Sequence, residues 1–165
     1  LKGRALIEEC NRIGMIIDVS HLNETGFWEV MQLTTKPVIA THSNVYSLCP
    51  HPRNLKHEQL EAIFAKNGIV GMTYVPQFTK TETRTVRISD LLHHLEAILT
   101  LGGSKHVGLG SDYDGISRHI RGLENAAAVS NLVEEIYRLY PASTAEDILW
   151  KNWFRFYENH LPDAN

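Results

Sequence analysis

Hydrophobic positions along the chain follow two spacings, a helical one and short unbroken apolar runs. The runs, typical of buried strands, cover residues 15–19, 37–40, 69–75 and 106–110. The helical spacing covers residues 4–13, a segment after Asn23, residues 55–66, 88–101 and 126–139, and a last segment after Ser143. Gly14 is suited to end the first helix and Asn23 to begin the second, while Ser143 and Glu146 fit a capping box. Residues 43–54 and 76–87 are polar and predicted to be irregular.

The alternation of helices and strands predicts an α/β fold with four parallel strands and right-handed crossovers. Strands that are apolar throughout are expected where helices cover both faces of a sheet. A doubly wound sheet and a (β/α)8 barrel both fit this pattern. A barrel of the TIM type needs about 250 residues and eight strands. If this 165-residue chain belongs to a barrel, we expect it to be the C-terminal half.

Composition excludes several function classes. The chain has 16 basic and 19 acidic residues and a net charge of −3, so charge alone predicts no binding to nucleic acid or an anionic membrane. No apolar run is long enough to span a membrane. Cys10 and Cys49 are too few for a disulfide framework, and the chain opens at Leu1 without a visible signal peptide. These features predict a cytoplasmic protein.

Candidate chemistry gathers where the predicted strands end, which is where α/β folds bind ligands. His21 follows the first strand, His42 the second and Asp112 the last. Imidazoles at adjacent strand ends can converge on one metal ion, and a carboxylate nearby can hold the ion or move protons. Either histidine alone is better explained as a strand cap bonded to backbone. Together with Asp112, the pair favours a metal site.

Other polar residues leave more than one interpretation open. Asp18 lies within an apolar strand, where it fits either a partner of a metal ligand or a carboxylate bonded to local backbone. Arg53 is in the loop after the second strand, so it can bind a carboxylate over the site or form a surface ion pair. Asp114 and Gly115 are typical of a turn. The other seven of the nine histidines lack ligand spacing and are predicted at the surface or in helix packing.

Aromatic residues crowd the last predicted helix. Trp150, Trp153, Phe154 and Tyr157 recur at helical spacing. The simplest interpretation of such a face is that it belongs to a hydrophobic core. We expect it to pack the helix onto the sheet or onto a neighbouring subunit. Neither a dinucleotide-binding glycine motif nor a Gly-x-Ser-x-Gly nucleophile elbow is present in the sequence.

Four stretches in order resemble the membrane dipeptidase (renal dipeptidase) family of zinc peptidases, in its bacterial branch. They are Ile17-Asp18-Val19-Ser20-His21, Thr41-His42-Ser43-Asn44, Pro52-Arg53-Asn54-Leu55 and the run from Val107 to Gly115, VGLGSDYDG. Each motif alone is weak, but the ordered set is specific and covers essentially the whole chain. The resemblance implies a (β/α)8 barrel that holds two zinc ions bridged by a glutamate.

The resemblance also implies a role for each candidate residue. His21 and His42 correspond to two ligands of one zinc ion, and Arg53 to the residue that binds the substrate carboxylate. Asp112 corresponds to the acid that contacts the substrate amine and shuttles protons. The family's remaining ligands, a His-x-Asp pair and the bridging Glu, belong to an N-terminal half that is absent from residues 1–165. The chain would therefore be half of one metallo-dipeptidase barrel, inactive by itself and dependent on the N-terminal half.

The implied activity is hydrolysis of dipeptides with a free C-terminal carboxylate by metal-activated water, in an enzyme that forms a dimer when complete. One alternative is another metal-dependent amidohydrolase, such as a lactonase or a phosphotriesterase-like enzyme. Those substrates lack a carboxylate and give Arg53 no role. The other alternative is a non-catalytic half-barrel module that binds a partner without metal.

Overall fold

Four parallel strands form one sheet in the computed structural model, which describes residues 2–82 and 84–162. The strands are β1 (Ile17–Asp18), β2 (Val38–Ala40), β3 (Ile69–Met72) and β4 (Val107–Leu109). Their spatial order, β1-β2-β3-β4, is their order in the chain. A doubly wound sheet reverses its strand order at a switch point, whereas a barrel adds each strand beside the previous one. The topology therefore confirms four parallel strands with the strand order of a barrel.

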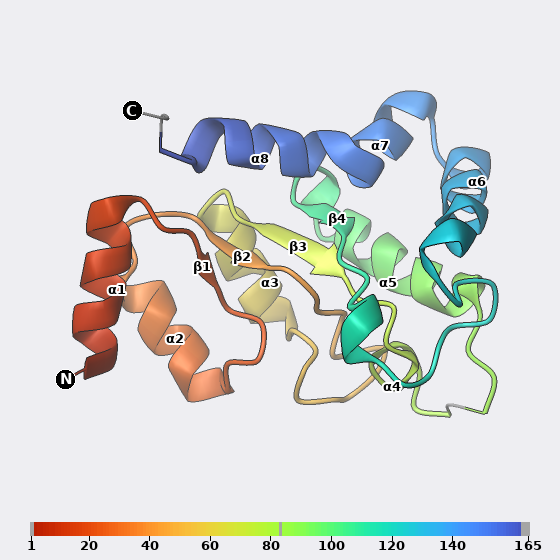
Figure 1. Ribbon diagram of the computed structural model, residues 1–165, viewed down its shortest axis with the longest axis horizontal. Helices are drawn as coiled ribbons and strands as arrows, with labels where there is room; N and C mark the ends of the chain where they lie inside the picture. Colours follow the sequence, from red (N-terminus) through yellow and green to blue (C-terminus); the bar gives the residue numbers. More distant parts are fainter. Residues whose placement is uncertain (1, 83, 163–165) are drawn as a thin grey trace.

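Helices connect and flank the strands (Figure 1). The longer ones are α1 (Lys2–Ile13), α2 (Glu24–Leu33), α3 (His57–Ala65), α5 (Ile88–Thr100), α6 (Val129–Leu139) and α8 (Asn152–His160). Gly14 ends α1 with a φ of +74°, and the Asn23 side chain accepts a hydrogen bond of 2.7 Å from the Gly26 N–H at the start of α2. Both predicted helix boundaries are thus confirmed. None of the described helices combines the length and the apolar character that a membrane crossing requires.

Some predicted boundaries are wrong. Helix α3 begins at His57 rather than at residue 55, because Leu55 instead pairs with Val45 in a parallel bridge. The segment predicted to be irregular, residues 76–87, contains one helical turn, α4 (Pro76–Thr79), and its residue 83 lies outside the described residues. Short 3₁₀ turns, η1 (Gly103–Lys105), η2 (Tyr113–Gly115) and η3 (Ala126–Ala128), lie in other connections.

The last helical segment starts differently from the prediction. It consists of α7 (Ala142–Glu146), a π-helical turn η4 (Asp147–Lys151) and α8 without a break. Pro141 occupies the N-cap position with a φ of −53°, so Ser143 lies inside the first turn and no side chain caps the helix. The capping-box prediction is wrong because the ring of Pro141 already fixes the backbone where the helix begins.

Trp153 anchors α8 to the sheet. Its Nε1–H donates a hydrogen bond of 3.1 Å to the carbonyl of Leu109. The indole lies so close to Gly108 that a β-carbon there would be 2.4 Å from Nε1. Trp150 and Phe154 point elsewhere and are 50% and 57% exposed. Tyr157 stacks on Trp153 with ring centroids 5.5 Å apart. The predicted aromatic face is therefore divided, with Trp153 on the sheet and Trp150 and Phe154 turned toward solvent.

The main core lies between the sheet and helices α2, α3 and α5. Its fully buried side chains include Phe27, Val38, Ala40, Leu60, Ile63, Val70, Met72, Leu91, Leu95, Ile98 and Val107. A second apolar cluster of Ile39, Ile69 and Phe156 packs α8 against the strands, and Figure 1 shows α8 running above the sheet. Contact of the strands with helices explains why their sequences are apolar throughout.

Two glycines let the strand ends approach one another. A β-carbon on Gly71 would lie 2.1 Å from the carbonyl oxygen of Thr41, and one on Gly110 would lie 1.9 Å from the same atom. Only glycine tolerates such an approach without displacement of the backbone. The close packing brings the segment after β2, which carries His42, toward the segment after β4, which carries Asp112.

Candidate active site

His21 and His42 face each other at the carboxyl ends of β1 and β2. Their Nε2 atoms are 2.9 Å apart, and the two rings meet at 61° with centroids 5.0 Å apart. His21 has a φ of +71°, a left-handed conformation that is uncommon for residues other than glycine. Such backbone conformations cluster at functional sites. The structure therefore brings together the two histidines that the sequence predicts to share a metal ion.

A polar chain runs from Asp18 through Thr41 to His42. The Thr41 hydroxyl donates to Oδ2 of Asp18, and Nδ1 of His42 lies 2.7 Å from the same hydroxyl oxygen. Oδ1 of Asp18 accepts from the backbone N–H of Ser20 (2.9 Å) and of Thr41 (3.1 Å). The interpretation of Asp18 as a carboxylate bonded to local backbone is therefore confirmed, and its connection to His42 runs through the Thr41 hydroxyl.

Arg53 extends from its loop to the two histidines. Its Nη1 donates to Nδ1 of His21 (3.2 Å) and its Nη2 to the carbonyl of His42 (3.4 Å). Its guanidinium carbon lies 5.4 Å from the ring centroid of Phe78, a cation–π distance. Its Nε is buried with no hydrogen-bond partner among the described residues. Arg53 is thus at the site and forms no surface ion pair in the part of the chain described.

Two buried asparagines hold the loop that carries Arg53. Asn54 donates from Nδ2 to the carbonyls of Cys49 (2.9 Å) and Phe78 (2.7 Å), and its Oδ1 accepts from the Asn44 N–H (3.1 Å). Asn44 in turn exchanges hydrogen bonds with the backbone of Thr73. The polar loop after β2 is therefore fixed to β3 and α4, which gives Arg53 a defined position.

Asp112 follows β4 and precedes the turn η2. Its φ of +65° is also left-handed, and a β-carbon on Gly115 would lie 2.3 Å from its Oδ1. Within the described residues its carboxylate makes no direct hydrogen bond to His21, His42 or Arg53. The negative charge of Asp112 acts to raise the pKa of His42 and that of Arg53, against the larger effect of burial, which lowers both. The structure therefore places Asp112 at the same end of the sheet but not in the hydrogen-bonded group.

Burial and charge set the protonation of the group. Burial lowers the pKa of His42, an effect that the charge of Asp112 opposes, so His42 is neutral at pH 7 as a metal ligand must be. Burial also lowers the pKa of Arg53, against the charges of Asp112 and Asp18. Arg53 nonetheless stays cationic, since the pKa of a guanidinium starts far above neutrality.

The geometry fits a metal ion with two protein ligands from this chain. Zinc binds imidazole nitrogen at about 2.0–2.1 Å, so one ion can contact two Nε2 atoms that lie 2.9 Å apart. Nδ1 of His42 contacts the Thr41 hydroxyl, which leaves its Nε2 facing His21. Nδ1 of His21 accepts from Arg53, so its Nε2–H donates to Nε2 of His42, and an ion bound to both Nε2 atoms requires that Arg53 release Nδ1 of His21. Within residues 2–82 and 84–162, no cluster of three or more His, Cys, Asp or Glu side chains could hold an ion.

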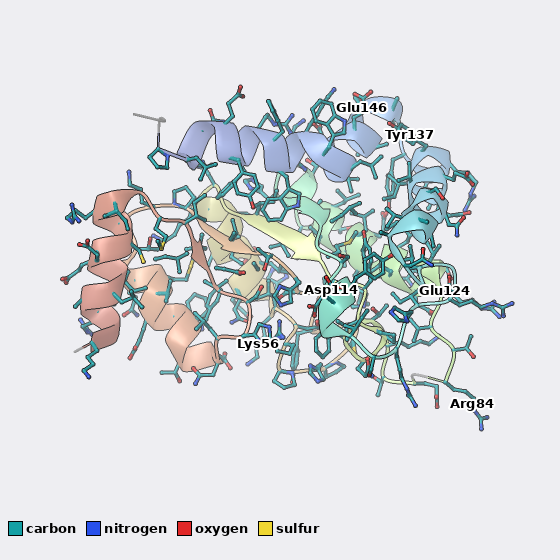
Figure 2. All side chains as sticks on the ribbon, in the orientation of Figure 1. Lys56, Arg84, Asp114, Glu124, Tyr137 and Glu146 are labelled. Atoms are coloured by element: carbon teal, nitrogen blue, oxygen red, sulfur yellow. The ribbon has the colours of Figure 1, made fainter. Side chains whose placement is uncertain are left out.

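Beside this group lies a cavity of about 270 Å³. Its walls include His21, Arg53, Tyr46, Lys56 and Glu24. Lys56 forms an ion pair of 2.8 Å with Glu24, which links the loop to the start of α2. Figure 2 shows Lys56 and Asp114 on the side of the sheet where the strands end. The cavity thus offers polar and charged walls directly next to His21.

Sequence reasoning missed several residues of this arrangement. Thr41 contacts His42, Ser20 accepts from the His42 backbone N–H (3.2 Å), and Phe78 lies under Arg53. Thr41 and Ser20 are direct neighbours of His42 and His21 in the chain, which is a signal that could have found them. The sequence contains no such signal for Phe78, because this residue lies in the segment predicted to be irregular.

His94 illustrates what the remaining histidines do. It is fully buried in α5, its Nδ1 accepts from the Val45 N–H (3.0 Å), and its Nε2 donates to the carbonyl of Thr79 (2.8 Å). Both ring nitrogens are thereby used in packing, as the sequence predicts for a histidine without ligand spacing.

The chain is similar to solved and curated proteins over nearly its whole length. A crystal structure of the dipeptidase AC, a metallopeptidase of family M19, superposes with a TM-score of 0.91 at 33% identity, over 96% of this chain and 48% of that one. A metallopeptidase from Rhodobacter sphaeroides, liganded with a phosphinate mimic of the dipeptide L-Ala-D-Ala, gives a TM-score of 0.90 at 33% identity, over 96% and 46%. Dipeptidase aclJ from Aspergillus oryzae is 36% identical over 81% of this chain and 32% of its own length.

The chain spans less than half the length of each of these three relatives. The sequence profile described as Membrane dipeptidase (Peptidase family M19) matches residues 2–161. That match includes both facing histidines, Arg53 and Asp112. The chain therefore belongs to the membrane dipeptidase family of metallopeptidases, peptidase family M19.

Proposed function

We propose that the protein hydrolyses dipeptides that carry a free C-terminal carboxylate, with zinc as its metal. The observation that carries this proposal is the contact of Arg53 with His21, whose Nε2 lies 2.9 Å from that of His42. A group that binds a carboxylate is thus adjacent to a pair of metal-ligand atoms. A dipeptide needs both at this short separation, because its scissile bond is one residue from its carboxylate.

His21 and His42 would hold one of two zinc ions through their Nε2 atoms. When bound, zinc supplies polarisation of the peptide carbonyl and acidification of the attacking water. The remaining ligands would come from the N-terminal half of the barrel, to which we assign a His-x-Asp pair and a bridging Glu. We further propose that the complete enzyme is a dimer.

Arg53 and Asp112 would carry the other steps. The planar fork of Arg53 binds the two carboxylate oxygens and fixes the dipeptide in register with the metal pair. Asp112 accepts a proton from the attacking water while the water oxygen bonds to the carbonyl carbon. It then delivers that proton to the amide nitrogen as the C–N bond breaks, which yields two amino acids. In the bound dipeptide its carboxylate also pairs with the free amine.

The experiment is a substrate comparison with the full-length protein, stripped of metal and then supplied with zinc. The panel contains a dipeptide, the same dipeptide as its C-terminal amide, a lactone and a phosphotriester. We expect zinc-dependent hydrolysis of the dipeptide and at least tenfold lower kcat/KM for the amide. Preferential turnover of the lactone or phosphotriester would instead assign the site to another amidohydrolase class. Binding of a partner protein without metal or turnover would indicate a non-catalytic module.

A further inference from the structure

The contacts of Thr41 fix the direction of the hydrogen bond to His42. An ionised carboxylate only accepts hydrogen bonds, so the Thr41 hydroxyl must give its single proton to Asp18. The hydroxyl oxygen then has only lone pairs to offer to Nδ1 of His42, 2.7 Å away. Nδ1 of His42 must therefore carry a proton, and its Nε2 has the lone pair, which faces Nε2 of His21 at 2.9 Å.

The carboxylate of Asp18 is held in place for this task. Its Oδ1 accepts from the backbone N–H groups of Ser20 and Thr41, at 2.9 and 3.1 Å. These contacts join the ends of β1 and β2 and leave Oδ2 directed at the Thr41 hydroxyl. The Ser20 hydroxyl also accepts from the backbone N–H of His42 (3.2 Å). The backbone of His42 is thus positioned by Ser20, and its ring is positioned by Asp18 through Thr41.

We propose that Asp18 and Thr41 are positioning residues that hold His42 as its Nδ1–H tautomer, with the Nε2 lone pair presented to the metal ion. This inference rests on the proposed function, which makes His42 a metal ligand. Ligating histidines commonly donate their other N–H to a carboxylate or carbonyl, which fixes the ring and its tautomer. Here a threonine hydroxyl relays that effect from a carboxylate on the neighbouring strand.

The test uses the full-length protein, labelled with ¹⁵N-histidine and free of metal, and measures the His42 tautomer by NMR. We expect Nδ1–H in the wild type. In Asp18→Asn the amide donates to the Thr41 oxygen, so the hydroxyl turns and donates to Nδ1 of His42, and the tautomer becomes Nε2–H. Thr41→Val removes the acceptor and also favours Nε2–H, whereas Thr41→Ser restores the wild-type tautomer.

A second readout is the zinc dissociation constant, measured by competition with a chromophoric chelator. Loss of a group that orients a ligand typically weakens metal binding 10–100-fold. We expect that loss in Asp18→Asn and Thr41→Val and not in Thr41→Ser. Thr100→Val is the matched control, because Thr100 is exposed on α5 and bonds only its own helix.

The inference and the proposed function can fail separately. An unchanged His42 tautomer and an unchanged zinc affinity in both Asp18→Asn and Thr41→Val would overturn the positioning role, even in an active dipeptidase. A tautomer that shifts as described in a protein that neither binds zinc nor hydrolyses dipeptides would show that Asp18 and Thr41 set the His42 tautomer. It would overturn the proposed function and, with it, the presentation of Nε2 to a metal ion.

Discussion

The guanidinium of Arg53 lies over the ring of Phe78, with its central carbon 5.4 Å from the ring centroid. Phe78 belongs to α4, and its carbonyl accepts a hydrogen bond from Asn54, the residue next to Arg53. The loop after β2 and the helix after β3 therefore support the same side chain. Through this support the hydrogen-bonding fork of Arg53 is directed at His21 instead of at solvent.

Replacement of Arg53 should therefore impair substrate binding selectively. A charge-assisted bidentate pair contributes about 1.5–3 kcal/mol, so Arg53→Ala should raise KM for a dipeptide about 10- to 150-fold. The dipeptide amide, which has no carboxylate, should be affected little. Arg53→Lys keeps the charge but loses the fork and should recover only part of the binding.

The control is Arg84→Ala, because Arg84 is exposed and points away from the site in Figure 2. Steady-state kinetics of both substrates with each variant provide the measurement. Equal losses for the acid and the amide would exclude carboxylate recognition by Arg53.

Asp112→Asn should lower kcat by about 10²–10⁴-fold, because an amide cannot carry the proton from water to the leaving amine. Asp114→Asn is the matched control, since Asp114 is exposed two residues further along the same turn. Pre-steady-state and steady-state assays with one dipeptide give the comparison. A kcat for Asp112→Asn within threefold of wild type would remove Asp112 from proton transfer.

His94 should make the free energy of unfolding depend on pH. Burial lowers the pKa of His94 below its usual value of 6.5, and a protonated ring could no longer accept the hydrogen bond from Val45. Below about pH 6.5 the unfolded chain binds a proton that the folded chain does not, so this contribution is complete above that pH and is lost as pH falls. The limiting slope is about 1.4 kcal/mol per pH unit.

Urea unfolding of wild type and His94→Gln between pH 5.5 and 7.5 measures this slope. The variant should be less stable at pH 7.5 but lose less stability on acidification than the wild type. His119→Gln changes an exposed histidine that is not in α5 and should keep the wild-type slope. Identical slopes for wild type and His94→Gln would show that His94 does not contribute.

The sequence predicted the elements and the site residues that depend on local pattern or on strand order. His21 and His42 were found because parallel strands place their carboxyl ends at one edge, and Asn23 because capping is local. Thr41 and Phe78 were not found, since their roles depend on side-chain directions across strands. Pro141 overrode the apparent capping signal of Ser143 through its own backbone constraint. The sequence predicted Asp112 at the correct end of the sheet. It could not predict that the Asp112 carboxylate makes no hydrogen bond to Arg53 or the two histidines, because that depends on side-chain directions.

Residues 1–165 produced alone should be inactive and should associate. Within the described residues, β1 and β4 each pair on one side only, and unpaired strand edges promote association. Several large apolar side chains are also exposed, among them Leu6 (63%), Met15 (55%) and Phe154 (57%). Sedimentation velocity and a dipeptidase assay with added zinc check both statements. A monodisperse monomer with dipeptidase activity would contradict the interpretation of this chain as half of a barrel.

The metal content of histidine variants tests the proposed zinc site most directly. Full-length wild type, His21→Ala, His42→Ala and His57→Ala would be purified identically and analysed for zinc per protein chain, with His57 as an exposed control on α3. We expect two zinc ions in the wild type and in His57→Ala, one fewer in His21→Ala and His42→Ala, and no dipeptide hydrolysis by the latter two. Full zinc content with normal hydrolysis in His21→Ala and His42→Ala would contradict the assignment of the facing histidines as metal ligands.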